Sequence, residues 1–546
     1  MSDATIIRPI HSSHDQHAHN SDHPLHSSRQ PRWTQRATSF GVFGILALGA
    51  IYAGTSLIHD LMAMGPTTTL LPFILLGVAL CIALGFEFVN GFHDTANAVA
   101  TVIYTHSMAP QIAVVWSGIW NLIGVVSSAG LVAFTVVSLL PVELILQVGS
   151  SAGFAMVFAL LIAAIIWNIG TWYFGIPNSS SHALIGSIIG VGLANQLMGG
   201  PNATSGVDWN QAVGVFRSLA FSPVVGFILS GLLLLLAKVA LPFPKLYTAP
   251  EGSKPPPPWI RGLLILTCTG VSFFHGSNDG QKGMGLIMLI LIGTVPTAYA
   301  LNHAIGADHV QIFHQASQRA EAVLAKHANS TTNDDVRKDV LAALEQRTVT
   351  PASIPALNAL VANIDTQVDE YGAYSQIPAA KTTNIRNDMY LASEMLSRIS
   401  KDDQLQLSTA EQADLKAYKG ELDNATKFIP TWVKIAVAIA LGMGTMIGWR
   451  RIVVTVGEKI GKTHLTYGQG AAAEIIAMVT IGAADQWGWP VSTTHVLSSG
   501  VAGTMAANRS GLQWSTILNM IMAWVLTLPV AIMLSASLFW IFRQVF

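Results

Sequence analysis

Two polar motifs lie inside apolar stretches of the chain, and each carries one aspartate among glycines. Residues 91–97 read Gly-Phe-His-Asp-Thr-Ala-Asn, and residues 276–282 read Gly-Ser-Asn-Asp-Gly-Gln-Lys. When the first glycines are aligned, Asp94 matches Asp279. An aspartate inside a membrane segment costs about 2.5–3.5 kcal/mol on insertion scales. Two of them at matched places predict a functional role, and the chemistry that suits a buried carboxylate is the binding of a proton or a cation.

A second pair of motifs carries hydroxyl groups. Residues 177–182 read Pro-Asn-Ser-Ser-Ser-His, and residues 490–495 read Pro-Val-Ser-Thr-Thr-His. Proline followed by serine or threonine is typical of a helix start, where free N–H groups and the positive end of the helix dipole favour anions. Two such starts that face each other would bind a tetrahedral oxyanion. The predicted substrate-binding residues are Ser179, Ser180, Ser181, Ser492, Thr493 and Thr494, with Asn97 and Lys282 from matched places in the first motifs.

The other polar residues of these segments are candidates for coupling to a cation or a proton. Bare carboxylates repel an anion, so the two aspartates are predicted to hold a cation or a proton that lies beside the substrate. Asparagine amides complete the oxygen shell of a cation, histidines relay protons, and glycines let the backbone unwind towards a ligand. The coupling candidates are Asp94, Asp279, Asn90, Asn278, Glu87, His182 and His495. The alternatives are structural, namely capping carboxylates, ordinary helix caps and hydrogen-bonded packing histidines.

The spacing of the motifs indicates that the chain has two related halves. Asp94 precedes His182 by 88 positions, and Asp279 precedes His495 by 216. Removal of a polar segment of about 128 residues, 302–430, restores a separation of about 88. We therefore predict a duplicated structure in which each half supplies part of one site.

The composition is that of a membrane protein with several spans. The chain has 546 residues, of which 51% are hydrophobic and 11% are charged, and its mean hydropathy is +0.48. Soluble domains carry about 25% charged residues, and a chain this long and apolar cannot hide its apolar surface in a soluble core. The net charge of −1 gives no indication of nucleic-acid binding. Cys81 and Cys268 lie in apolar stretches and are interpreted as packing residues.

The apolar segments predict an all-α fold with about 10–12 transmembrane helices, two repeats and some broken half-helices, and inverted repeats are the commoner arrangement in carriers. Residues 302–430 differ because they hold 12 Lys or Arg and 17 Asp or Glu. The predicted division is a disordered His-rich tail (1–37, with metal binding as the alternative), an extra transmembrane segment (38–60), a first membrane repeat (70–241), a cytoplasmic linker (242–260), the start of the second membrane repeat (261–301), a polar helical insert (302–430) and the remainder of the second repeat (431–546).

The motifs together resemble the inorganic phosphate transporter (Pit) family, and in particular the bacterial low-affinity phosphate permeases. The resemblance rests on residues 91–101 and 275–283 and on the paired hydroxyl-histidine motifs at 179–182 and 492–495. Residues 163–175 and 444–462 are also similar to that subgroup. The match runs from about residue 71 to the C-terminus, is weakest across 302–430, and leaves the first 60 or so residues as an addition.

The resemblance implies a secondary transporter of inorganic phosphate, not an enzyme, in the bacterial inner membrane among lipids. Sodium-coupled members carry an Asn-Asp pair with a further Asn in both halves, whereas this chain has His93 and Lys282 at two of those places. A lysine at a cation site argues against sodium there. The bacterial subgroup is proton-driven and carries phosphate largely as a neutral metal complex. The resemblance therefore implies no permanently bound cofactor, a co-transported proton, and Mg²⁺ or another divalent ion that travels with the phosphate and meets Asp94 and Asp279; a homodimer is left open.

Other functions use the same residues. The first is a sodium-coupled phosphate symporter, and the second is a carrier of another oxyanion or of a divalent metal. A membrane-embedded hydrolase would need a Ser–His arrangement in space that no spacing here indicates, and the chain has no His-Glu-x-x-His or P-loop motif. A receptor role is disfavoured because both half-sites are retained.

Overall fold

The computed structural model describes residues 32–62, 71–140, 150–199, 206–207, 209–252, 254–328, 335–346, 348–350, 352–401 and 405–545. The predicted His-rich tail lies almost wholly outside these ranges. Within them the chain is helical, as predicted, and has no β-strand beyond one isolated bridge between Gly461 and Leu512.

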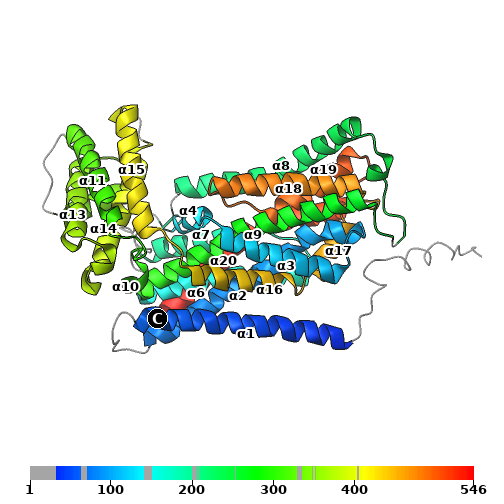
Figure 1. The fold of residues 1–546 in the computed structure, drawn as a ribbon, viewed down its shortest axis with the longest axis horizontal. Helices are drawn as coiled ribbons and strands as arrows, with labels where there is room; N and C mark the ends of the chain where they lie inside the picture. The colour runs from blue at the N-terminus through cyan, green and yellow to red at the C-terminus, as the bar shows by residue number, and fades with distance from the viewer. Residues whose placement is uncertain are drawn as a thin grey trace, which may run out of the picture.

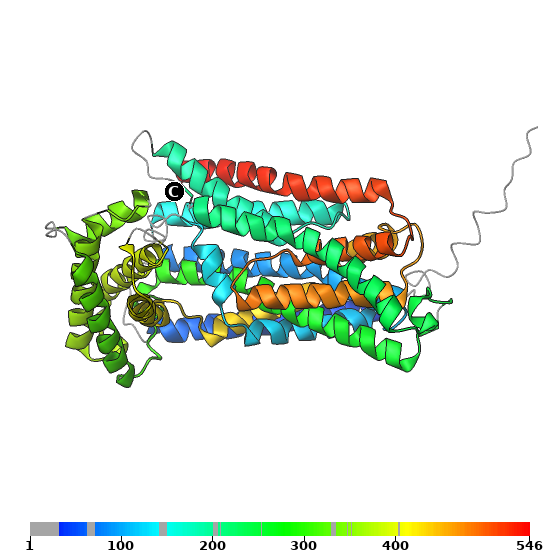
Figure 2. The ribbon, with the colours of Figure 1, turned by 90° about the horizontal axis from the view of Figure 1, so that it is seen from above.

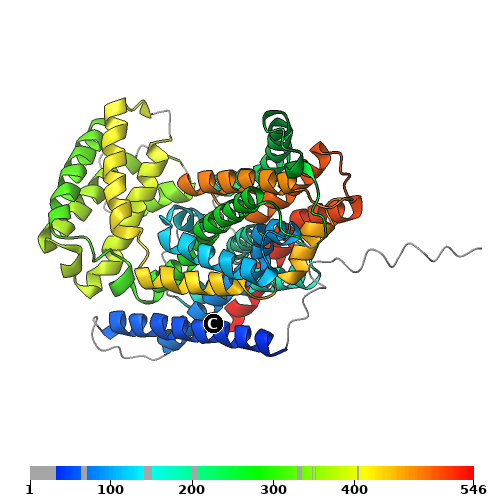
Figure 3. The same cartoon turned by 45° about the vertical axis from the view of Figure 1, so that its right-hand side comes forward.

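The first half of the chain contributes an elongated bundle of helices (Figure 1). These helices are α1 (Arg32–Met62), α2 (Leu71–Tyr104), α3 (Pro110–Ser127), α4 (Leu131–Val137), α6 (Ser151–Tyr173), α7 (Ser180–Met198) and α8 (Trp209–Ala240), followed by the short 3₁₀ turn η1 (Pro244–Tyr247). Helix α1 lies along the outside of the bundle against α16, where Gly49 of α1 faces Ile439 (Figures 1 and 3).

The second half resumes the bundle on both sides of a separate helical group. The bundle helices are α9 (Pro258–Thr294), α10 (Pro296–Tyr299), α16 (Thr431–Thr445), α17 (Arg450–Glu458), α18 (Tyr467–Gln486), α19 (Thr493–Ala507) and α20 (Trp514–Val545). The separate group comprises α11 (Asp308–His327), α12 (Val336–Gln346), α13 (Ser353–Tyr371), η2 (Tyr374–Gln376), α14 (Ala379–Ile399) and α15 (Thr409–Thr426).

Helices α11–α15 form a compact group at one end of the long bundle, and we call this group the insert (Figure 2). Its buried residues, which include Phe313, Leu360 and Tyr418, make a hydrophobic core separate from the two cores of the bundle. The helices of the insert are amphipathic: each packs one apolar face into this core and leaves its polar face at the surface. It occupies the segment that the sequence predicts to be a polar helical insert.

Seven helices of the described chain are long and apolar enough to cross a membrane: α1, α2, α3, α6, α7, α8 and α20. The number rises to eight if α15 and α16, which meet at 72°, are taken together. Helices α9, α18 and α19 lie beside them in the bundle (Figure 1), and α9 and α18 are made less apolar by the polar residues considered below. The expected number of 10–12 crossings stays a prediction.

Helices α2 and α9, which carry the two aspartate motifs, run in opposite directions through the bundle. The start of α9 meets the end of α2, because the Arg261 Nε donates to the Ser107 carbonyl oxygen at 2.8 Å. Farther along both helices, Glu87 of α2 lies against Gly283 of α9, where a Cβ would be 2.2 Å from the Glu87 Oε1. The two halves therefore enter the centre of the molecule from opposite ends.

The same helix crossing occurs twice, each time between the two halves. A Cβ on Gly91 of α2 would lie 2.2 Å from the Leu441 carbonyl oxygen of α16, and one on the matched Gly276 of α9 would lie 2.1 Å from the Asn121 carbonyl oxygen of α3. Both motifs lie inside continuous helices. The expectation that these glycines unwind the backbone is therefore wrong, because their physical role is to let two helix backbones touch.

A second crossing is duplicated in the same way. A Cβ on Gly190 of α7 would lie 2.2 Å from the Ile532 carbonyl oxygen of α20, and one on Gly503 of α19 would lie 2.0 Å from the Phe227 carbonyl oxygen of α8. Gly190 and Gly503 lie eight residues after the two motif histidines, His182 and His495. Each crossing thus joins one helix from the first half of the chain to one helix from the second half. Neither half of the chain could therefore form this core alone.

We predict that Gly276→Ala destabilises the protein whereas Gly262→Ala, on the same helix, does not. The methyl group at 276 would collide with a backbone carbonyl that cannot rotate away, and overpacking of this kind costs about 1–3 kcal/mol. No atom lies within 4 Å of a Cβ placed on Gly262. The melting temperature of both variants in detergent is the measurement, and equal melting temperatures would contradict the close crossing.

Candidate functional site

The two hydroxyl-histidine motifs begin helices in the middle of the bundle, as predicted. Ser179 caps α7 by accepting a hydrogen bond from the His182 backbone N–H at 3.2 Å, and Ser492 caps α19 by accepting one from the His495 N–H at 3.1 Å. Both serines are buried. The first turns of two helices, one from each half, are therefore presented with their positive ends towards the interior.

The carboxylate of Asp94 connects these two helix starts. Its Oδ2 accepts a hydrogen bond from the Ser180 hydroxyl at 2.5 Å, and its Oδ1 accepts one from the Thr494 hydroxyl. The Ser180 hydroxyl also lies 2.6 Å from Oδ1 of Asn90, one turn earlier on α2. The His93 Nδ1 is 3.5 Å from the same carboxylate. Asp94 is thus held by groups from three helices and both halves.

Asp279, the matched aspartate, has a different partner. The Lys282 ammonium donates to Asp279 Oδ1 at 2.5 Å and to the Ser181 hydroxyl at 2.6 Å, and all three groups are buried. Ser181 in turn donates to the Val491 carbonyl oxygen at 3.1 Å, just before the α19 cap. The lysine therefore joins α9 to the start of α7.

His275 is the residue of the site that the sequence analysis did not assign. Its Nδ1 lies 2.7 Å from Oδ1 of Asn121 on α3, and the Asn121 amide nitrogen donates to Thr445 at 3.2 Å. An amide oxygen only accepts, so the Nδ1 of His275 carries the proton and Nε2 presents a lone pair in the neutral ring. The sequence feature that indicates a role for His275 is its four-residue spacing to Asp279, because residues four apart lie on the same face of a helix.

Nε2 of His275 points between the two aspartates. It is 3.5 Å from Asp279 Oδ2 and 4.0 Å from Asp94 Oδ2. One ligand atom from each of these three buried residues can be chosen so that all lie within 4.8 Å of one another. Two carboxylates and an imidazole, with the imidazole fixed by Asn121, form a donor set suited to a divalent cation, and the nitrogen ligand favours transition metals over Mg²⁺.

The charges of this region do not balance among the described residues. Glu87, Asp94 and Asp279 are buried, and Lys282 is the buried ammonium beside them. Glu87 packs directly over Gly283 of α9, where a Cβ would lie 2.2 Å from the Glu87 Oε1. Three ionised carboxylates and one ammonium leave two negative charges, which a low-dielectric interior does not tolerate. The site therefore requires protons or a divalent cation.

The remaining predicted residues lie around this centre. The Asn278 amide donates to the Trp489 carbonyl oxygen at 3.1 Å and so holds the loop before α19. The rings of His182 and His495 stack at 4.6 Å, and His495 stacks on Trp524 at 4.3 Å, behind the helix caps. The hydroxyl of Thr493 is buried without a partner among the described residues. The side chain of Asn97 lies outside what the structure describes.

A second polar cluster on α9 was also missed. Asp485, near the end of α18, accepts hydrogen bonds from Ser277 at 2.7 Å and from Gln281 at 2.6 Å. The side-chain Oε1 of Gln281 also accepts a hydrogen bond from the Val132 backbone N–H at 2.9 Å, at the start of α4. Ser277 and Gln281 belong to the motif that carries Asp279, but their partner is more than 200 residues away and no local pattern indicates it.

Most of the chain matches a known protein family. The model of the family described as "Phosphate transporter family" matches residues 90–535, which includes both aspartate motifs and both helix starts. The chain belongs to the phosphate transporter family. The resemblance that the motifs suggested is thereby confirmed, and the transporters of this family place the chain among multi-pass proteins of the inner membrane.

Individual relatives match over nearly their whole length. The chain is 42% identical to the low-affinity inorganic phosphate transporter PitA of Escherichia coli K12 over 490 residues, which is 86% of this chain and 97% of that protein. It is 41% identical to PitB of the same organism and 27% identical to a probable low-affinity inorganic phosphate transporter of Bacillus subtilis. A solved sodium-dependent phosphate transporter matches 87% of this chain and all of its own with 18% identity and a TM-score of 0.48.

We predict that His275→Gln weakens binding of Mn²⁺ or Zn²⁺ by about tenfold or more, since even the outer-shell partners of metal sites contribute 10–100-fold. Calorimetric titration of the full-length protein is the measurement. The six histidines between residues 11 and 26 should first be replaced by asparagine so that they do not bind the metal themselves. His309→Gln, at an exposed position of the insert, is the matched control. Equal affinities in the two variants would exclude His275 as a ligand.

Proposed function

We propose that this protein is a secondary active symporter of inorganic phosphate, driven by protons, that carries phosphate as a complex with a divalent metal. Membership of the phosphate transporter family and relatives that are named as low-affinity phosphate transporters support phosphate as the substrate. Transport is a non-enzymatic function. The Ser180 and Ser181 hydroxyls bond to Asn90, Asp94 and Val491, which disfavours a hydrolase built on these serines.

The observation that carries the metal-phosphate proposal is the geometry of His275. Its Nε2 lone pair faces Asp279 and Asp94, the side chains of two buried acids. Three electron-rich groups at this separation repel one another unless a positive charge lies between them. A divalent ion bound there would satisfy all three and would supply positive charge to the two buried aspartates. The metal is cargo in this proposal, since it enters and leaves with the phosphate.

The helix starts are the proposed phosphate site. The first turns of α7 and α19 offer N–H groups, helix dipoles and the hydroxyls of Ser180, Ser181, Thr493 and Thr494. In the described conformation the Asp94 carboxylate accepts two of these hydroxyls. A phosphate that carries its own divalent ion can approach the same donors, because the ion then lies between phosphate oxygens and the aspartates.

Lys282 supports proton rather than sodium coupling. Its ammonium is bonded to Asp279 at 2.5 Å, so one of the two aspartates already has a full positive charge beside it. A free sodium ion at the same carboxylate would be repelled by that ammonium at close range, whereas a divalent ion that arrives bound to phosphate brings the negative charge of the phosphate with it. A proton can instead be taken up by any of the neighbouring carboxylates or imidazoles as the metal leaves. His182 and His495 are the proposed relay groups behind the helix starts.

We further propose that the two halves are inverted repeats that move against each other in alternating access. The opposite directions of α2 and α9 and the duplicated glycine crossings between halves support this arrangement. Inverted repeats around a central site give two related conformations, one open to each side of the membrane. The site lies where elements of both halves meet.

The distribution of basic residues supports an orientation with the insert outside the cytoplasm. One end of the bundle holds the start of α1, the η1 loop and α17 (Figure 1). Basic residues gather at that end: Lys238, Lys245, Lys254, Arg261, Arg450, Arg451, Lys459, Lys462 and Arg509. The end of α1 is at the opposite end, beside the insert, where Asp60 accepts a hydrogen bond from Tyr299 at 2.6 Å. By the positive-inside rule the basic end faces the cytoplasm.

The orientation predicts a labelling pattern in intact cells. In a Cys81→Ala, Cys268→Ala background, Lys381→Cys on the insert should react with a membrane-impermeant maleimide. Lys245→Cys at the basic end should react only after the inner membrane is permeabilised. Both lysines are exposed, so accessibility to the reagent decides the result. The reverse pattern would invert the proposed topology.

Asp94→Asn and Asp279→Asn should each lower phosphate uptake into proteoliposomes by about 100-fold, the upper end of the losses seen at metal-site partners. Each change removes a negative charge that the metal requires. Asp369→Asn, at an exposed position of the insert, is the control and should transport normally. Full uptake by either site variant would contradict the site.

The coupling ion is tested in the same vesicles. Wild-type uptake should require an inward proton gradient and a divalent cation and should not respond to a sodium gradient. Uptake driven by sodium would retain phosphate transport but would overturn the role assigned to Lys282. Absence of phosphate uptake under any gradient, from folded protein, would favour another oxyanion or a divalent metal as the substrate.

A further inference from the structure

A buried arginine lies outside the central site, at the junction between the insert and the bundle. Arg386 of α14 is only 5% exposed, and its Nε has no hydrogen-bond partner among the described residues. The guanidinium stacks 4.9 Å from the Tyr390 ring and donates one 3.3 Å hydrogen bond to its neighbour Asn387. The nearby Asp388 is bound instead by Arg337 at 2.6 Å. Arg386 therefore has no ion pair within the described chain.

A buried guanidinium without a counter-ion is costly. Burial lowers the pKa of Arg386 from its ordinary value, which reflects the loss of hydration around the charge. Structural arginines in protein interiors are normally paired with carboxylates or with several carbonyl oxygens. An unpaired one that lines a cavity is instead arranged for an anion that comes from outside.

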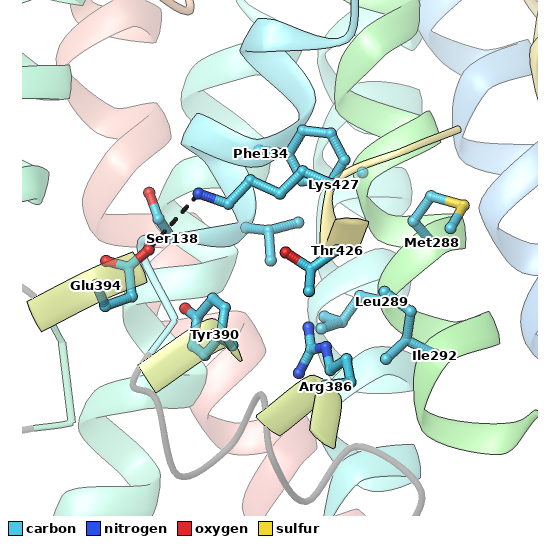
Figure 4. Close-up of a pocket in the computed structure, with 12 residues that line it drawn as sticks. Phe134, Ser138, Met288, Leu289, Ile292, Arg386, Tyr390, Glu394, Thr426 and Lys427 are labelled. Carbon is cyan, nitrogen blue, oxygen red and sulfur yellow. Dashed lines mark ion pairs between the residues drawn. The ribbon is translucent and has the colours of Figure 1, made fainter. Parts of the chain in front are cut away.

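The Arg386 guanidinium points into a cavity between α14 of the insert and α4 and α9 of the bundle (Figure 4). Lys427 enters the cavity from the opposite side and forms ion pairs with Asp423 at 2.9 Å and with Glu394 at 3.8 Å. Ser138, Tyr390 and Thr426 contribute hydroxyl groups to the lining. The cavity is narrow, about 30 Å³, but it adjoins a wider one of about 580 Å³ with which it shares Phe134, Ser138, Glu394 and Lys427.

The wider cavity is also basic. Arg398, Lys401 and Lys427 line it, against two acidic residues, Glu394 and Asp423. With Arg386, the two cavities hold four cationic and two acidic side chains. A recess lined by an excess of one charge raises the local concentration of the opposite ion. An arginine beside a lysine and several hydroxyls is the donor set that recognises phosphate oxygens.

We propose that Arg386 and Lys427 form a second, outer site for a phosphate oxyanion, which receives the substrate before it reaches the central site. This inference rests on the proposed function and on the orientation of the insert. The floor of the cavity includes Met288 and Leu289 of α9. These residues lie six and seven positions beyond Lys282, which is about 10 Å along the helix axis. The outer site is therefore close to the central site and on the side from which uptake would start.

Direct binding separates the outer site from the central one. Lys282→Gln should disable the central phosphate site, and the full-length variant should still bind labelled inorganic phosphate. The double variant Lys282→Gln, Arg386→Gln should lose that residual binding, whereas Lys282→Gln, Arg319→Gln should keep it. Arg319 is a matched arginine on the surface of the insert, paired with Asp414 at 3.2 Å. Absence of residual binding, or its persistence without Arg386, would overturn the outer site.

The origin of the oxyanion is tested by competition. The outer site lies near the membrane surface, so the headgroup of an anionic lipid carries the same phosphate chemistry as the free ion. Binding of inorganic phosphate to Lys282→Gln in lipid-free detergent would assign the site to substrate. If phosphatidylglycerol binds there but inorganic phosphate does not, the assignment to substrate is wrong.

Transport gives an independent readout. Arg386→Gln should raise the KM for phosphate uptake about tenfold and leave kcat unchanged, because the loss of a charge-assisted hydrogen bond weakens capture alone. Arg386→Lys, which retains the charge but not the planar fork, should be intermediate. Arg386→Gln should also keep its melting temperature without phosphate, since it removes a buried unpaired charge. A lower melting temperature with an unchanged KM would show a structural role and overturn the proposal.

The two hypotheses can fail separately. Wild-type vesicles that take up no phosphate would contradict the proposed function, while binding to Lys282→Gln would still measure the outer site. Normal uptake together with the absence of Arg386-dependent binding would leave the transporter intact and remove the outer site alone.

Discussion

The buried carboxylate of Asp94 is the group on which the arrangement of the site depends. It accepts hydrogen bonds from Ser180 of the first half and Thr494 of the second half. A carboxylate withdrawn from water is stable only when its oxygens are hydrogen-bonded or paired. The helices α7 and α19 must therefore begin within reach of one side chain. Because the N-terminal dipoles converge where the helices begin, this acceptor also determines where an oxyanion can be bound.

The close crossings of the helices extend this constraint to the metal ligands. Gly276 allows α9 to touch the Asn121 carbonyl oxygen of α3, and the Asn121 side chain then reaches the neighbouring His275 at 2.7 Å. The missing side chain at 276 thus sets the orientation of an imidazole at 275. A larger residue would separate the two helices and would release the histidine from its partner. Packing and chemistry are consequently determined by the same contact, and the duplicated crossing at Gly91 brings α2, which carries Asp94, against the backbone of α16.

Local rules of sequence predicted the parts of the site that are local. The starts of α7 and α19 follow from Ser179 and Ser492 as caps, and the matched aspartates follow from the duplicated motif. The glycines were assigned the wrong role, because backbone contact between helices is a tertiary feature that resembles flexibility in a sequence. The four-residue spacing of His275 to Asp279 was a local signal, but Asn121, which orients the His275 ring, lies 154 residues earlier and outside every motif. The position of Arg386 beside a cavity could not be predicted from the sequence, because that cavity forms only where the insert packs on the bundle.

The two halves are alike in framework but unlike in charge, and this difference gives the site its polarity. Ser180 matches Thr493 and Asp94 matches Asp279, so a symmetric site would have Thr493 donate to Asp279. Instead Thr493 has no partner among the described residues, and Lys282 bonds to Asp279. The lysine replaces a neutral hydroxyl by a positive charge in one half only. Asp279 thereby has a fixed positive charge of the protein beside it, whereas Asp94 is held by hydroxyl groups and a histidine. The lysine at the place of Asn97 thus gives a related framework two carboxylates of unequal surroundings.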